Sequence, residues 1–126
     1  MRSYSIPNYI RYKEDIKAKL KRLPDKPYNE YTREELIIKF LPLVENLARK
    51  FPSGQQASGI MNIMDFIQEG SKGLTRAVDR IDWHTLMSSD DIEKTLKSFL
   101  AKRIRGAIRR GIDANRGTMR IPEHKL

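Results

Sequence analysis

Apolar residues recur every three or four positions from Leu96 to Ile108, which places them on one side of a single α-helix. A half-buried strand would instead alternate apolar and polar residues, and no such alternation of useful length occurs in the 126 residues. Residues 36–48 and 66–81 repeat the helical spacing. The sequence therefore predicts an all-α fold, a compact helical bundle whose amphipathic helices share one apolar seam.

The helix expected from Thr32 to about Lys50 begins with a clear start signal. Thr32 can cap its first amides, and Glu35, three positions on, completes a capping box. Pro42 interrupts the apolar pattern, because proline cannot donate a backbone hydrogen bond inside a helix. We expect it to kink this helix or to divide it into a short and a longer piece.

Residues 52–62 have the composition of a loop, and the next helix is expected from Ile63 or Met64 to about Ile81. An acidic and amide cluster opens this helix, where the helix dipole favours negative charge. Its members are Asp65, Gln68 and Glu69. Such a cluster is most often a polar helix N-terminus, and otherwise a surface for a protein partner; the residues alone leave both interpretations open.

Residues 82–89, which carry the only tryptophan, are predicted to form a loop. Ser89 is expected to cap the last helix, with acidic side chains in its first turn. That helix is predicted to end near Gly111, since residues 115–117 read Asn-Arg-Gly, a turn sequence. Pro122 then predicts an extended segment, because the residue before a proline disfavours the helical conformation.

Charge divides the chain into three parts. Residues 1–27 carry eight Lys/Arg against three acids (+5), residues 28–93 seven against eleven (−4), and residues 94–126 ten against two (+8). Basic blocks attract polyanions through counterion release, so nucleic acid is the leading class of partner. Residues 1–31 are expected to form a basic N-terminal arm, and residues 32–126 the helical domain.

The cationic side chains of the last helix lie away from its apolar seam. Those opposite the seam are Ser98, Lys102, Arg105 and Arg109; Arg103 and Arg110 flank it, and Arg116 and Arg120 extend the charge beyond the helix. Such a stripe can follow a phosphate backbone, and arginine also forms bidentate hydrogen bonds with guanine. The alternative is a basic face that is only solvated. DNA binding is the prediction.

Catalysis is not expected. The two histidines, His84 and His124, lie far apart without a nucleophile pattern, and no glycine-rich phosphate loop follows a strand. The chain has no cysteine, so disulfides and thiolate metal sites are excluded. No stretch approaches the roughly 18 apolar residues of a membrane span, and the N-terminus lacks a secretory signal. The prediction is a cytoplasmic protein with no cofactor, metal or membrane partner.

The run from Asp65 to Asp82, followed by a basic helix and by Thr118-Met119-Arg120-Ile121-Pro122, resembles region 2 of the bacterial sigma-70 family. Residues 36–51 are similar to the preceding helix of that family, and the match spans roughly residues 34–126. The resemblance implies a sigma region-2 type bundle that docks on the clamp helices of the RNA polymerase beta-prime subunit. It further implies that this bundle directs core polymerase to promoter DNA at a minus-ten-like element and assists melting.

The resemblance assigns roles by position. It implies polymerase contacts at Asp65, Gln68, Glu69, Ser71 and Thr75. Gly106 and Arg109 occupy the positions at which the family reads duplex bases. Lys102 and Arg103 occupy its paired-tryptophan positions, and Phe99 replaces a neighbouring aromatic residue.

Several departures from the family change these expectations. Gly106 has no side chain to read a base, and Lys102 and Arg103 exchange base stacking for phosphate attraction, which predicts a divergent promoter and weaker melting. The chain stops just after region 2, so we expect either a fragment or a reduced sigma factor that a separate transcription activator assists. Such reduced factors resemble those of tailed phages, which act in the infected host cell. The alternative is a stand-alone helical DNA-binding protein without polymerase contact.

Overall fold

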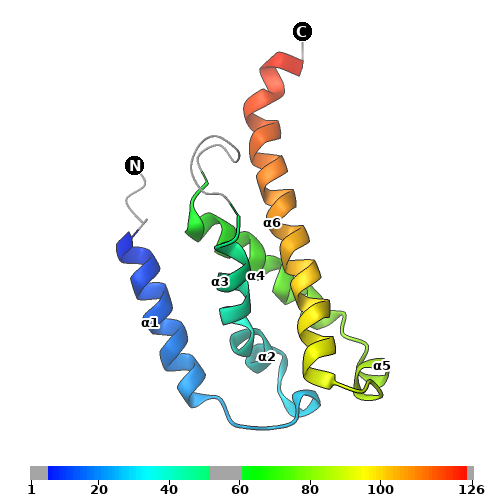
Figure 1. The fold of residues 1–126 in the computed structure, drawn as a ribbon. Helices are drawn as coiled ribbons and strands as arrows, with labels where there is room; N and C mark the ends of the chain where they lie inside the picture. Colours follow the sequence, from blue (N-terminus) through cyan, green and yellow to red (C-terminus); the bar gives the residue numbers. More distant parts are fainter. Residues whose placement is uncertain (1–5, 52–60, 125–126) are drawn as a thin grey trace.

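The computed structural model describes residues 6–51 and 61–124, with side chains for 8–51 and 61–115. All regular structure in these ranges is helical, which confirms the all-α fold. The elements are α1 (Ile6–Arg22), a 3₁₀ turn (Tyr28–Glu30), α2 (Arg33–Lys39), α3 (Leu41–Ala48), α4 (Ile63–Asp79), α5 (Trp83–Met87) and α6 (Ile92–His124) (Figure 1). None of the described helices is both long and apolar enough to cross a membrane.

The packing of α4 against α6 is the centre of the bundle (Figure 1). A glycine permits this close approach, since a Cβ at Gly73 would lie 2.6 Å from the Cβ of Ala107 and 3.1 Å from the carbonyl oxygen of Arg103. The apolar side chains that the sequence placed on the seam fill the interface. The fully buried ones are Phe66, Ile67 and Leu74 of α4, Leu96, Leu100, Ile104 and Ile108 of α6, and Val44 of α3.

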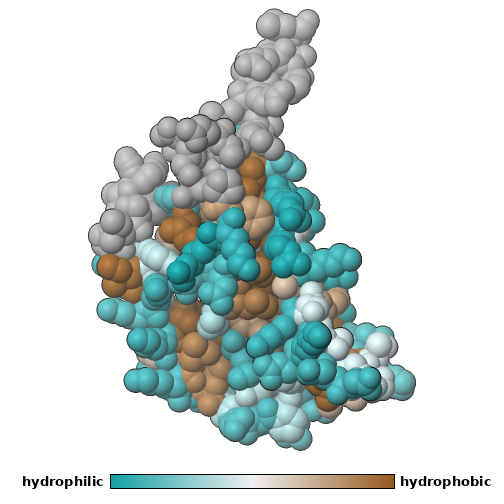
Figure 2. Space-filling view, in the orientation of Figure 1, coloured by the Kyte–Doolittle hydropathy of each residue, from teal (hydrophilic) through white to brown (hydrophobic). Residues whose placement is uncertain are grey.

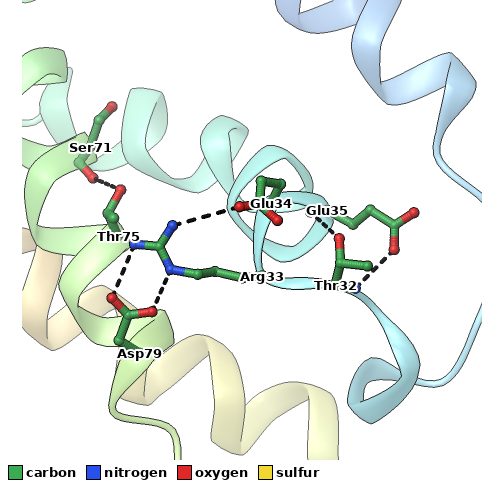
Figure 3. Close-up of polar contacts among 7 residues, drawn as sticks. All are labelled: Thr32, Arg33, Glu34, Glu35, Ser71, Thr75 and Asp79. Carbon is green, nitrogen blue, oxygen red and sulfur yellow. Dashed lines mark hydrogen bonds and ion pairs between the residues drawn. The ribbon is translucent and has the colours of Figure 1, made fainter.

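The helix expected from Thr32 to Lys50 is divided at Pro42, as predicted. Pro42 lies in the first turn of α3, where its missing N–H has no helical partner to lose. The capping box of α2 is also confirmed (Figure 3). Oγ1 of Thr32 accepts from the amide of Glu35 (3.1 Å), and the carboxylate of Glu35 accepts from the amide of Thr32 (2.9 Å).

The start of α4 at Ile63 agrees with the sequence prediction. The side-chain oxygen of Asn62 caps it by accepting hydrogen bonds from the amides of Met64 (3.0 Å) and Asp65 (3.2 Å). The helix ends at Asp79 rather than at Ile81, because the amide of the next residue turns back to the carbonyl of Ala77 (2.9 Å).

The prediction of a loop over residues 82–89 is wrong, since this segment contains α5. The carboxylate of Asp82 caps α5 by accepting from the amide (3.3 Å) and the hydroxyl (2.8 Å) of Thr85. These hydrogen bonds stabilise the charged carboxylate, and they hold the pKa of Asp82 below its ordinary value. Burial of Leu86 holds the short helix on the bundle.

The predicted cap of the last helix is also wrong. The hydroxyl of Ser89 donates to the carbonyl of Leu86 (2.7 Å), so it belongs to the end of α5. Asp91 caps α6 instead, because its carboxylate accepts from the amide of Lys94 (3.1 Å). The acidic side chain inside the first turn is Glu93.

The C-terminal part of α6 differs most from the sequence prediction. The helix runs to His124, through the expected end at Gly111, the expected turn at residues 115–117 and the expected extended segment at Pro122. A glycine inside a helix costs only about 1 kcal/mol, which the continuing hydrogen bonds of a long helix offset. Pro122 lies in the last turn at a cost, since proline lacks the N–H of a helical hydrogen bond and its ring crowds the carbonyl four residues before it. This part of α6 extends beyond the other helices (Figure 1).

Helix α1 ends at Arg22, two residues before Pro24, which cannot continue a helix. It contacts the rest of the bundle through α2 and α3 (Figure 1). The hydroxyl of Tyr9 donates to the carboxylate of Glu45 on α3, and Ile16 is buried. The boundary of the basic arm at residue 31 stays a prediction.

Candidate functional site

The cationic stripe of α6 lies where the sequence predicts it. Lys102 and Arg109 are exposed on the side opposite the buried seam, together with Ser98, and Arg105 is half-buried. The guanidinium of Arg109 lies 5.9 Å from the ring centre of Phe51, which holds this side chain against the end of α3. The stripe therefore presents positive charge along one surface of the helix.

A groove of about 620 Å³ lies between α4 and α6, beside this stripe. Five of its lining side chains are basic: Arg76 and Arg80 from α4 and the adjoining turn, and Lys102, Arg103 and Arg110 from α6. Among the described residues, no acidic side chain lines it. Converging cations without a compensating carboxylate form a site for an anion such as a phosphate.

Sequence reasoning missed Arg76 and Arg80. Both lie within the run from Asp65 to Asp82, in which the resemblance implied polymerase contacts but no DNA contacts. Their signal was their spacing of four residues, which places them on one side of a helix, next to the buried Gly73 and Ala77. The structure turns that side toward α6.

The aromatic residue of the groove is covered by a cation. Phe99 is half-buried, and the guanidinium of Arg103 lies 4.8 Å from its ring centre. A base could stack on this face of the ring only after the guanidinium moved aside. Gly106 lies in the same groove, and a Cβ there would meet only a guanidinium nitrogen of Arg110 at 3.5 Å.

The proposed protein-binding residues lie along the outward face of α4, but their polar groups already have intramolecular contacts. The carboxylate of Asp65 accepts from the amide of Asn62 (2.9 Å), which is the helix-terminus role that the sequence left open. Glu69 lies 3.6 Å from the ammonium of Lys72. The exposed Gln68 lies between them, so the face is polar and mixed in charge rather than strongly anionic.

The other end of this face joins α4 to α2 (Figure 3). The hydroxyl of Thr75 donates to the carbonyl of Ser71 (2.9 Å). Arg33 of α2 donates two hydrogen bonds to Asp79, from Nε (2.5 Å) and Nη2 (3.1 Å). This guanidinium holds the pKa of Asp79 below its ordinary value.

The structure therefore keeps the two sets of predicted site residues apart. The α4 set, Asp65 to Thr75, lies outside the α4–α6 groove, whereas Phe99, Lys102, Arg103, Gly106 and Arg110 line it. Arg116 and Arg120 lie on α6 beyond the described side chains. Among the residues whose side chains are described, the two sets are not buried against each other.

A metal site was the other chemistry to consider in the described part of the chain. Within the described residues, no three His, Cys, Asp or Glu side chains are close enough together to hold a metal ion. His84 is an exposed residue of α5.

Comparison with known proteins does not assign a family. No protein-family model matches the chain, and no solved structure matches it.

Proposed function

We propose that this chain is a sigma factor-like subunit of transcription initiation. Its α4 face would bind the beta-prime clamp helices of core RNA polymerase, while α6 and the α4–α6 groove bind promoter DNA at a minus-ten-like element. The observation that carries the DNA part is the groove, whose charged lining, within the described side chains, consists of five cations. The polymerase part rests on the resemblance of residues 65–82 to sigma region 2.

The charge of the site suits a phosphate backbone. The groove and the exposed Arg109 lie on neighbouring surfaces of α6, so a strand in the groove would continue along the stripe. Each phosphate that is neutralised releases counterions, so affinity should fall steeply as salt rises. Phosphate contacts would set the position of the protein on DNA, whereas contacts with base edges would specify the sequence.

Assistance to melting would be weak in this chain. In the groove, Lys102 and Arg103 supply charge instead of rings, and Arg103 covers Phe99. Flipped bases gain about 1–3 kcal/mol each from stacking on aromatic side chains, a gain that cations replace only in part. Most of the DNA affinity would therefore come from attraction between cations and phosphates, and little from stacking of flipped bases.

Polymerase docking would depend on shape and hydrogen bonds more than on net charge. The carboxylates of the α4 face are matched by Lys72, by the helix cap and by Arg33. This internal pairing also favours the alternative function, a stand-alone helical DNA-binding protein. The two functions differ in one property, the need for core polymerase.

Run-off transcription with core polymerase, with and without this protein, tests the proposal. A parallel pull-down compares Glu69→Lys with Asp90→Lys, an exposed position on the turn before α6, since both substitutions change the charge equally. We expect only Glu69→Lys to abolish polymerase capture, with DNA binding of both variants largely unchanged. Tight promoter binding without polymerase, together with no effect on run-off products, would establish the stand-alone alternative.

A further inference from the structure

A second groove, of about 390 Å³, lies between α1 and α3, apart from the surfaces discussed above. Ile10, Ile16 and Leu20 of α1 line it, and Pro42 of α3 faces them. Figure 2 shows an apolar strip beside α1, bordered by hydrophilic surface. Grooves lined in this way bind the apolar face of an amphipathic helix.

Ile10 marks the open end of this groove. Its side chain is 50% exposed, and the other large hydrophobic residue exposed in the described ranges is Met87, at 37%. Single exposed apolar side chains are common, but Ile10 continues a lined groove, whereas Met87 lies in α5 without lining any groove described here. Burial of Ile10 by a partner would remove this apolar surface from water.

The walls of the groove are held together before any partner binds. Glu45 of α3 accepts a hydrogen bond from the hydroxyl of Tyr9 and lies 3.6 Å from the ammonium of Lys13. Arg49 contacts the same carboxylate at 3.5 Å. These contacts fix α1 against α3 and neutralise Glu45, so a partner would meet a preformed surface with little net negative charge.

The charge of α1 as a whole indicates the charge of the partner, since the lysines and glutamates that line the groove are equal in number. Lys13 and Lys17 lie on the rim, and Glu14 is the other acidic residue there besides Glu45. Over its whole length α1 carries six Lys/Arg and two acidic residues. An acidic chain would therefore be attracted to α1 and a basic one repelled.

We infer that the α1–α3 groove binds an acidic amphipathic helix of a partner protein. The apolar residues of that helix would enter the groove over Ile10, Leu20 and Pro42, and its carboxylates would meet Lys17, since Lys13 already lies beside Glu45. This site is separate from the α4 face and the α4–α6 groove, and it does not depend on their proposed function.

Two synthetic peptides of about 18 residues test the inference at physiological salt. Both contain the same leucine and glutamate residues; one arranges leucine at i, i+3, i+4 and i+7, and the other disperses it. Calorimetry should show at least about tenfold tighter binding of the amphipathic peptide. In NMR spectra, addition of this peptide should shift the backbone amide resonances of α1 and of the start of α3. Equal affinity for the two peptides would show that only their negative charge attracts them to this basic protein. That result would overturn the inference.

Matched variants locate the site. Ile10→Glu is expected to weaken binding of the amphipathic peptide at least about tenfold, while Met87→Glu leaves it unchanged. Circular dichroism checks that both variants fold. Lys17→Glu, at an exposed rim position, provides a second test and should also weaken binding of the amphipathic peptide. Equal affinity for all variants, displacement of the peptide by duplex DNA, or dimerisation of the protein through this groove would each overturn the inference. Ile10→Glu should leave DNA binding intact, which separates this result from the test of the proposed function.

Discussion

The side chain of Glu69 lies directly over the backbone of Gly111. A Cβ at Gly111 would come within 2.6 Å of Cγ and 2.9 Å of Cδ of Glu69. The glycine in α6 thus makes room for an acidic side chain of α4, and the two helices share this contact where the proposed protein-binding face borders the DNA-binding helix.

Gly111→Ala should therefore change the position of Glu69. Because Glu69 is only half-buried, its side chain can move outward, and the protein should remain folded. We expect capture of core polymerase to fall severalfold while DNA binding is retained. Gly106→Ala is the matched control, since its Cβ would make only an ordinary contact with Arg110. Equal polymerase capture by the two variants would show that the position of Glu69 does not matter.

Gly73→Ala should destabilise the bundle. Its Cβ would meet the Cβ of Ala107 and backbone of α6, neither of which can move without separating the helices. Overpacking of this kind costs about 1–3 kcal/mol of unfolding free energy. Gly106→Ala should instead add up to about 1 kcal/mol, because alanine is the better helix former in open space. Urea denaturation measures both changes, and a Gly73→Ala protein as stable as wild type would contradict the packing described.

High pH should loosen α1. Burial, with the hydrogen bond to Glu45, raises the pKa of Tyr9 from 10.0 to about 12, and burial raises that of Tyr12 to about 12. A pKa raised by folding contributes stability that is complete below pH 10.0 and is lost as the pH approaches 12, because the unfolded chain ionises first. Ultraviolet titration of tyrosinate should show late ionisation in the folded protein only.

Tyr12→Phe provides the control for that titration. The buried hydroxyl of Tyr12 has no well-formed hydrogen bond within the described residues, although the side chain of Ser71 lies near it. Its removal should leave stability at neutral pH unchanged or slightly higher, since a buried unpaired polar group is costly. It should also remove one late-titrating tyrosine. A large loss of stability at neutral pH would instead indicate that the hydroxyl is paired.

Replacement of Arg76 and Arg80 by glutamine should weaken DNA binding and its dependence on salt. If each guanidinium neutralises one phosphate, the slope of log affinity against log salt should fall by about one for each residue. Titration of labelled promoter DNA at several salt concentrations measures the slope. Arg11→Gln with Arg22→Gln, exposed residues of α1, removes the same charge elsewhere. An equal change in the two double variants would assign the effect to net charge rather than to the groove.

Elements with strong local signals were predictable from the sequence. The capping box of Thr32, the division at Pro42 and the buried stripe of α6 depend on residues close in the chain, and the structure confirms them. The side of α6 that carries Lys102 and Arg109 follows from the same periodicity.

Features that depend on contacts between distant segments were not predictable. Gly111 reads as a helix end until Glu69 is seen to occupy the space beside it. Arg76 and Arg80 join the cationic groove because Gly73 brings α4 close to α6. The pairing of Asp79 with Arg33 likewise joins residues 46 positions apart.

Because α6 is continuous, the angle around the helix between its buried face and its cationic face is the same along its length. One added residue near the middle of the helix would rotate everything beyond it by about 100°, carrying arginines toward the interior and isoleucines toward water. Seven added residues would restore the register almost completely, since they complete about two turns. Insertions and deletions in this helix should therefore be tolerated only when their length keeps the buried and cationic residues on their present sides.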